Sequence, residues 1–94
     1  MGRYKMERPT THRIDDKEPT YEELKDMVGG YIELAYDDGN TQIVCNEEGK
    51  IHGLPVNEEA TKEWAKQLGK NSFYEMPDIL VGDCVILTGE ALMK

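Results

Sequence analysis

Apolar residues recur at helical spacing over residues 20–28, which predicts the first helix of the chain. The apolar side chains in this stretch are three or four positions apart and share one face. Thr20 and Glu23 have the Thr-x-x-Glu spacing of a capping box, in which each side chain bonds the backbone of the other residue. Gly29 follows, and glycine readily takes the left-handed conformation that ends a helix. We therefore expect a short amphipathic helix that ends at Val28.

A second helix is predicted from residue 58 to about residue 68. Asn57 precedes it, and asparagine is a preferred N-cap residue because its side chain accepts a bond from a backbone N–H group. Gly69 ends the pattern. The apolar stripe of this helix is expected to contain Ala60, Trp64, Ala65 and Leu68.

Alternating apolar and polar residues on either side of residues 37–40 predict a β-hairpin. The turn sequence Asp-Asp-Gly-Asn favours a two-residue type I′ turn, which requires a positive φ angle at Gly39. Paired residue numbers then add up to 77, which puts Glu33 on a polar outer face. The opposite, apolar face is expected to hold Ile32, Leu34, Ile43 and Cys45.

Two more segments complete the predicted sheet. Residues 51–54 follow a turn at Gly49 and extend the hairpin to a three-stranded meander. Residues 78–87 are the most apolar run and predict a central strand with a bend at Gly82. The expected fold class is α+β, a single compact domain with an antiparallel sheet of four to five strands and two helices packed on it. Its core is expected to contain Ile32, Leu34, Ile43, Val85 and Leu87, with Trp64 packed against them.

Charge divides the chain into two parts. Its 94 residues include 11 Lys+Arg and 19 Asp+Glu, for a net charge of −8. Residues 1–17 carry a basic excess and are expected to form a basic N-terminal arm or, because residues 3–7 alternate, an edge strand. Residues 18–94 are expected to form the acidic α+β domain. The negative balance argues against direct nucleic-acid binding, and no apolar run approaches the ~20 residues of a membrane span.

The cysteines and histidines do not indicate a catalytic or metal site. Cys45 and Cys84 lie in apolar runs and are expected to be reduced core residues of a cytoplasmic protein. The first residues lack the apolar segment of a signal peptide, which agrees with that location. His12 and His52 have no metal-ligand spacing to the cysteines. We therefore expect neither an enzyme nor a bound metal or cofactor.

Three segments carry a resemblance to a family. They are Val-Gly-Gly-Tyr-Ile-Glu at 28–33, Asn-Glu-Glu-Gly-Lys at 46–50 running on to Gly-Leu-Pro-Val-Asn at 53–57, and Asp-Ile-Leu-Val-Gly-Asp at 78–83. Their order and spacing resemble a small domain of unknown function found in bacteriophages, conjugative elements and some bacteria. The resemblance covers residues 20–88, implies a mobile-element context and brings no catalytic residues.

Acidic doublets at turns and helix starts favour a protein that imitates nucleic acid. Duplex DNA carries a charge every ~1.7 Å, so an acidic face can occupy a basic groove meant for DNA. We expect a phage or mobile-element accessory protein, a monomer or small homo-oligomer, that inhibits a host defence nuclease in the manner of anti-CRISPR or anti-restriction proteins. Acidic residues at such positions also have an ordinary role in solubility. The residues expected to contact the basic protein surface are Asp37, Asp38, Glu47, Glu48, Glu58, Glu59 and Glu63.

A nucleotide- or small-molecule-binding module is the alternative function. Aromatic rings stack on bases, and an asparagine at a helix start can orient a phosphate. The residues of this alternative site are Tyr31, Asn57, Trp64, Phe73 and Tyr74. A coherent acidic face would favour the first hypothesis, and an aromatic-lined pocket would favour the second.

Overall fold

The computed structural model describes residues 8–94, and its first helix begins and ends where the sequence predicts. Helix α1 (Tyr21–Val28) follows the N-cap residue Thr20. The Glu23 N–H group donates to Thr20 Oγ1 at 3.1 Å, and the Thr20 N–H group donates to Glu23 Oε1 at 2.8 Å. Gly29 ends the helix in the left-handed conformation, with φ 80°. The predicted capping box and glycine stop are confirmed.

The second helix also begins at its predicted cap. Helix α2 (Glu58–Gln67) follows Asn57, whose Oδ1 accepts the N–H group of Ala60 at 2.9 Å. Two 3-10 helices, η1 (Phe73–Glu75) and η2 (Gly89–Ala91), follow α2 and the last strand. Within residues 8–94, each helix is too short or too polar to cross a bilayer.

The strands form a mixed sheet, so the prediction of an antiparallel sheet is wrong. Strands β1 (Thr11–Ile14), β2 (Ile32–Asp37), β3 (Thr41–Asn46) and β4 (Cys84–Thr88) lie in the order β1-β4-β3-β2. β3 is antiparallel to both of its neighbours, but β1 runs parallel to β4. β1 has only four residues, which are too few for a sequence pattern to indicate the direction of its partner strand. The edge strand suggested by residues 3–7 lies outside the described residues.

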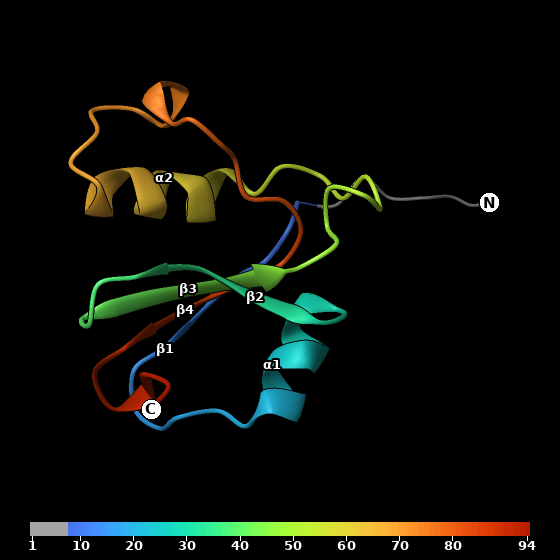
Figure 1. Cartoon of the computed structure of the whole chain (residues 1–94), viewed down its shortest axis with the longest axis vertical. Helices are drawn as coiled ribbons and strands as arrows, with labels where there is room; N and C mark the ends of the chain where they lie inside the picture. Colours follow the sequence, from blue (N-terminus) through green and yellow to red (C-terminus); the bar gives the residue numbers. More distant parts are fainter. Residues whose placement is uncertain (1–7) are drawn as a thin grey trace.

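The sheet separates two cores, because α1 covers one face and α2 covers the other (Figure 1). All six residues of β3 are buried, as expected for a central strand that is covered on both faces. The α1-side core contains Leu24, Val28, Val44, Val85, Leu87 and Ala91, with Ile32 half-buried against it. The α2-side core contains Ile43, Cys45, Ala60, Leu80, Cys84 and Ile86, with Trp64 packed against it.

The turn between β2 and β3 is not the predicted one. Gly39 has the expected positive φ of 88°. A type I′ turn over Asp38 and Gly39 also requires a positive φ at Asp38, but every positive φ angle in residues 8–94 belongs to a glycine, so type I′ is excluded. Gly39 and Asn40 are instead the central pair, as in a type II′ turn, because Asp38 N–H donates to the Thr41 carbonyl. The Asp38 side chain fixes this arrangement, since its Oδ1 accepts the N–H groups of Asn40 and Thr41, both at 2.8 Å.

Next to the changed turn, paired residue numbers add up to 79 instead of 77, as in Tyr36 and Ile43, and this two-residue shift leaves side chains on their predicted face. The bulge between Leu34 and Tyr36 then shifts the register by one residue, which turns the side chains of residues 32–34 to the opposite face from the predicted one. Glu33 therefore pairs with Cys45 and shares the α2 side of the sheet with it, although the sequence predicted a polar outer face for Glu33. Leu34 pairs with Val44 at the edge of the sheet and is 44% exposed, so its predicted burial is wrong.

The predicted third strand of the meander is absent from the described residues. Residues 47–53 form turns that pack beside the segment 78–83, which leads into β4. The contact is close, because a Cβ atom at Gly49 would lie 2.8 Å from Val81 Cγ2. Val56 forms an isolated bridge to Val81. Residues 78–83 pack against these turns and are not part of the strand. β4 therefore begins at Cys84, whereas the sequence predicted a strand from residue 78.

Candidate functional site

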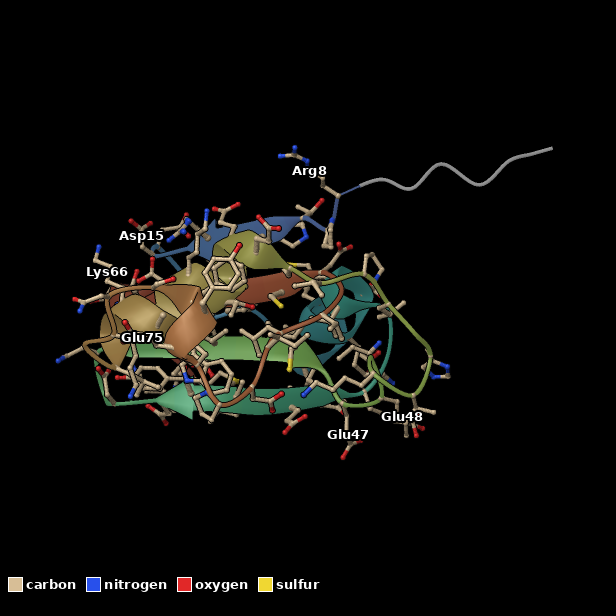
Figure 2. All side chains as sticks on the ribbon, turned by 90° about the horizontal axis from the view of Figure 1, so that it is seen from above. Arg8, Asp15, Glu47, Glu48, Lys66 and Glu75 are labelled. Carbon is tan, nitrogen blue, oxygen red and sulfur yellow. The ribbon has the colours of Figure 1, made fainter. Side chains whose placement is uncertain are left out.

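The acidic residues predicted to contact a partner are spread over three parts of the molecule. Asp37 and Asp38 lie at the turn between β2 and β3, where Asp37 Oδ1 accepts the Gly39 N–H group. Hydrogen bonds from the turn, first of all the Asn40 N–H group, hold the pKa of Asp38 below its usual range. Glu47 and Glu48 follow the other end of β3, a six-residue strand of roughly 20 Å. Figure 2 shows this second pair at one end of the molecule.

The acidic residues of α2 include two that pair with β1. The Arg13 guanidinium donates from Nη2 to Glu59 Oε2 at 3.2 Å and from Nη1 to Glu63 Oε1 at 3.3 Å. The pKa of Glu63 is lowered, first by the hydrogen bond from Gln67 and then by Arg13. These contacts tie α2 to β1, so Glu59 and Glu63 already have a structural partner.

A cavity with a charged rim lies on the α2 side of the sheet. Its volume is about 160 Å³, and its lining comes from the hairpin of β2 and β3, from the turns after β3 and from the segment before β4. Trp64 of α2 completes the wall. We call this feature the acidic cavity; its apolar lining includes Ala35, Cys45, Trp64, Ile79 and Leu80, and its exposed charged residues are Glu33, Glu47, Lys50 and Asp78.

The acidic cavity has more negative than positive charge. Lys50 forms an ion pair with Asp78, and the hydrogen bond from Lys50 is the main reason that the pKa of Asp78 is lowered. In residues 8–94, neither Glu33 nor Glu47 takes part in an ion pair. Two carboxylates beside an apolar wall are therefore available to a cationic group.

The cysteine thiols are expected to react slowly in the folded protein. Burial raises the pKa of Cys45 to about 11 and that of Cys84 to about 12, with the charge of Glu33 as a further cause for Cys45. The reactive thiolate is therefore a small fraction at pH 8, roughly one part in a thousand for Cys45. Labelling by a thiol reagent at pH 8 should be slow until denaturant is added and should accelerate as pH rises. Rapid labelling of native protein at pH 8 would contradict this burial.

The residues of the alternative ligand site do not meet in one place. Asn57 is 1% exposed and caps α2, so its side chain does not face a ligand. Tyr31 lies beside Lys25, whose Nζ is 5.0 Å from the ring centroid. Trp64 lines the acidic cavity. Phe73 and Tyr74 do come together, with ring centroids 4.4 Å apart, in η1.

The acidic cavity joins residues that the sequence assigned to different sites and adds three that it missed. Glu47 was expected at a protein interface and Trp64 at a ligand pocket, yet both line this cavity. Glu33, Lys50 and Asp78 were not predicted as site residues. Glu33 was missed because the predicted register placed it on the wrong face. The continuous apolar character of residues 43–45 was the available signal for a strand with two covered faces.

Residues 4–91 match the family model described as "Domain of unknown function (DUF3846)". The chain therefore belongs to this family, as the three sequence segments indicated. No curated protein and no solved structure matches the chain.

Proposed function

We propose that this DUF3846 domain is a protein-binding module that accepts a lysine or arginine side chain of a basic partner in the acidic cavity. The observation that carries the proposal is the pair of carboxylates, Glu33 and Glu47, beside the indole of Trp64. An arginine side chain combines an aliphatic stem with a planar cation that bonds carboxylates and stacks on aromatic rings. The lining of the acidic cavity offers a complementary surface to each of these parts.

The size of the acidic cavity favours a side chain over a free metabolite. Its 160 Å³ is close to the ~150 Å³ of an engineered cavity that admits benzene. Pockets for drug-sized ligands have roughly 300–1,000 Å³. The occupant is therefore a group of side-chain size, held by a partner that contacts the surface around the opening.

The partner class that we propose is a nucleic-acid-binding protein with a basic groove. The net charge of −8 attracts such a surface at long range, and the carboxylates of the cavity supply a specific contact. In a phage or mobile element, an inhibitor of a host defence nuclease would have this form. Charge complementarity and the resemblance to proteins of mobile elements support this part of the proposal.

A titration with matched peptides tests the cavity directly. Trp64 is the only tryptophan of the chain, so its fluorescence reports on the cavity. The peptide Gly-Arg-Gly-Arg-Gly should change this fluorescence saturably. The same peptide with citrulline, a neutral isostere of arginine, should not, because it lacks the cation that Glu33 and Glu47 attract.

Variants separate the local charge from the overall charge. The double substitution Glu33→Gln and Glu47→Gln should weaken arginine-peptide binding roughly tenfold, since each exposed ion pair is worth up to ~1 kcal/mol. The control pair Glu75→Gln and Glu90→Gln makes the same change in net charge away from the cavity and should leave binding nearly unchanged. Equal binding of the citrulline peptide, or equal weakening by the control pair, would contradict the proposal.

A further inference from the structure

We propose a second binding site, for a free nucleotide, in the groove between α2 and η1. This groove does not depend on the acidic cavity. Figure 2 shows Lys66 and Glu75 near it at one end of the molecule, whereas Glu47 and Glu48 lie at the other end. Both sites border α2, but they share no lining residue, and carboxylates predominate in the cavity whereas lysines predominate in the groove.

An aromatic pair forms one wall of the groove. Phe73 and Tyr74 are stacked at 4.4 Å between ring centroids, with 29° between the ring planes. Tyr74 is 86% exposed, so it has ring surface that no side chain of residues 8–94 covers. The Ser72 hydroxyl accepts the N–H group of Tyr74 at 3.1 Å and fixes the start of η1. An exposed ring on a fixed turn is a platform on which a base can stack.

Lysines form the other wall, in a chain whose net charge is negative. Lys62 and Lys66 are four residues apart and therefore neighbours on one face of α2, and Lys70 follows the end of the helix. Lys62 Nζ lies 6.0 Å from the Phe73 ring centroid, so this ammonium group adjoins the aromatic pair. Among residues 8–94, none of the three lysines forms an ion pair. Glu58 is the one carboxylate among the lining residues.

The dimensions and charge of the groove select a nucleotide over smaller and larger ligands. Its volume of about 710 Å³ lies within the roughly 300–1,000 Å³ typical of small-molecule sites. Three ammonium groups match the charge of one polyphosphate, while the exposed tyrosine matches the base. A long nucleic-acid strand would extend beyond the lysines over a surface with net charge −8, which repels it.

Calorimetric titration with four probes tests this assignment. ATP should bind more tightly than adenosine, which lacks the phosphates, and more tightly than tripolyphosphate, which lacks the base. A ten-residue oligothymidylate should bind more weakly than ATP. Adenosine or tripolyphosphate binding as tightly as ATP, tighter binding of the oligonucleotide, or no binding of ATP at millimolar concentration would overturn the proposal.

Two matched pairs of variants locate the site. The substitutions Lys62→Gln, Lys66→Gln and Lys70→Gln together should weaken ATP binding about tenfold or more. The control variant Lys17→Gln, Lys25→Gln and Lys94→Gln has the same net charge but changes the α1 side, and it should bind as the unmodified protein does. Tyr74→Ser should likewise weaken ATP binding roughly tenfold, whereas Tyr31→Ser should not. Equal effects of a variant and its control would overturn the assignment to this groove.

Discussion

Replacing Asn57 with alanine is expected to lower the free energy of unfolding by about 3 kcal/mol. Its side chain is 1% exposed, and both its amide oxygen and its amide nitrogen form hydrogen bonds. Oδ1 accepts the Ala60 N–H group at 2.9 Å and the Thr11 hydroxyl at 3.0 Å, and Nδ2 donates to the Gly82 carbonyl at 2.9 Å. Asn57 thus connects α2, β1 and the segment before β4. Loss of an N-cap costs about 0.5–2 kcal/mol, and each buried polar group left without a partner costs a further ~1–3 kcal/mol.

Urea unfolding followed by circular dichroism measures this loss. Asn71→Ala is a suitable control, because Asn71 is exposed and an exposed substitution changes stability by about 0.5 kcal/mol or less. A decrease of under ~1 kcal/mol in the free energy of unfolding of Asn57→Ala would contradict the stabilising role that we assign to these hydrogen bonds.

Leu24→Ala is expected to cost about 2–5 kcal/mol, whereas Leu34→Ala should cost under ~1 kcal/mol. Leu24 is 1% exposed in the α1-side core, where Val44, Val85 and Leu87 surround it. Leu34 is 44% exposed at the edge of the sheet, so alanine leaves no buried cavity there. Equilibrium unfolding of both variants compares the observed register with the predicted one, which buries Leu34. Similar large losses for the two variants would favour the predicted register.

Local signals were sufficient to predict the helices. The Thr20–Glu23 capping box, the Asn57 N-cap and the glycine after α1 act within one turn of a helix, so neighbouring residues decide the outcome. The hairpin shows the limit of such signals. Asp38 and Gly39 fit a type I′ turn, but the hydrogen bonds that the Asp38 side chain accepts from Asn40 and Thr41 favour Gly39 and Asn40 as the central pair. The one-residue bulge between Leu34 and Tyr36 then changed the face of Glu33.

The sites were harder to predict because distant segments form them. Trp64, Phe73 and Tyr74 were recognised as candidate contacts from residue type. Their separation into a cavity and a groove depends on how η1 and residues 78–81 pack against α2, which no local pattern encodes. The charges of Glu33 and Asp78 became part of a site only through the observed register and the turns after β3.

An NMR titration with Gly-Arg-Gly-Arg-Gly tests the central claim most directly, because the single indole N–H signal belongs to Trp64. We expect this signal and the backbone amides of Glu33 and Glu47 to shift saturably, while those of Phe73 and Tyr74 remain in place. The citrulline peptide should cause no such shifts. Shifts that fall outside the acidic cavity, or that the citrulline peptide reproduces, would contradict a cavity that binds a cationic side chain.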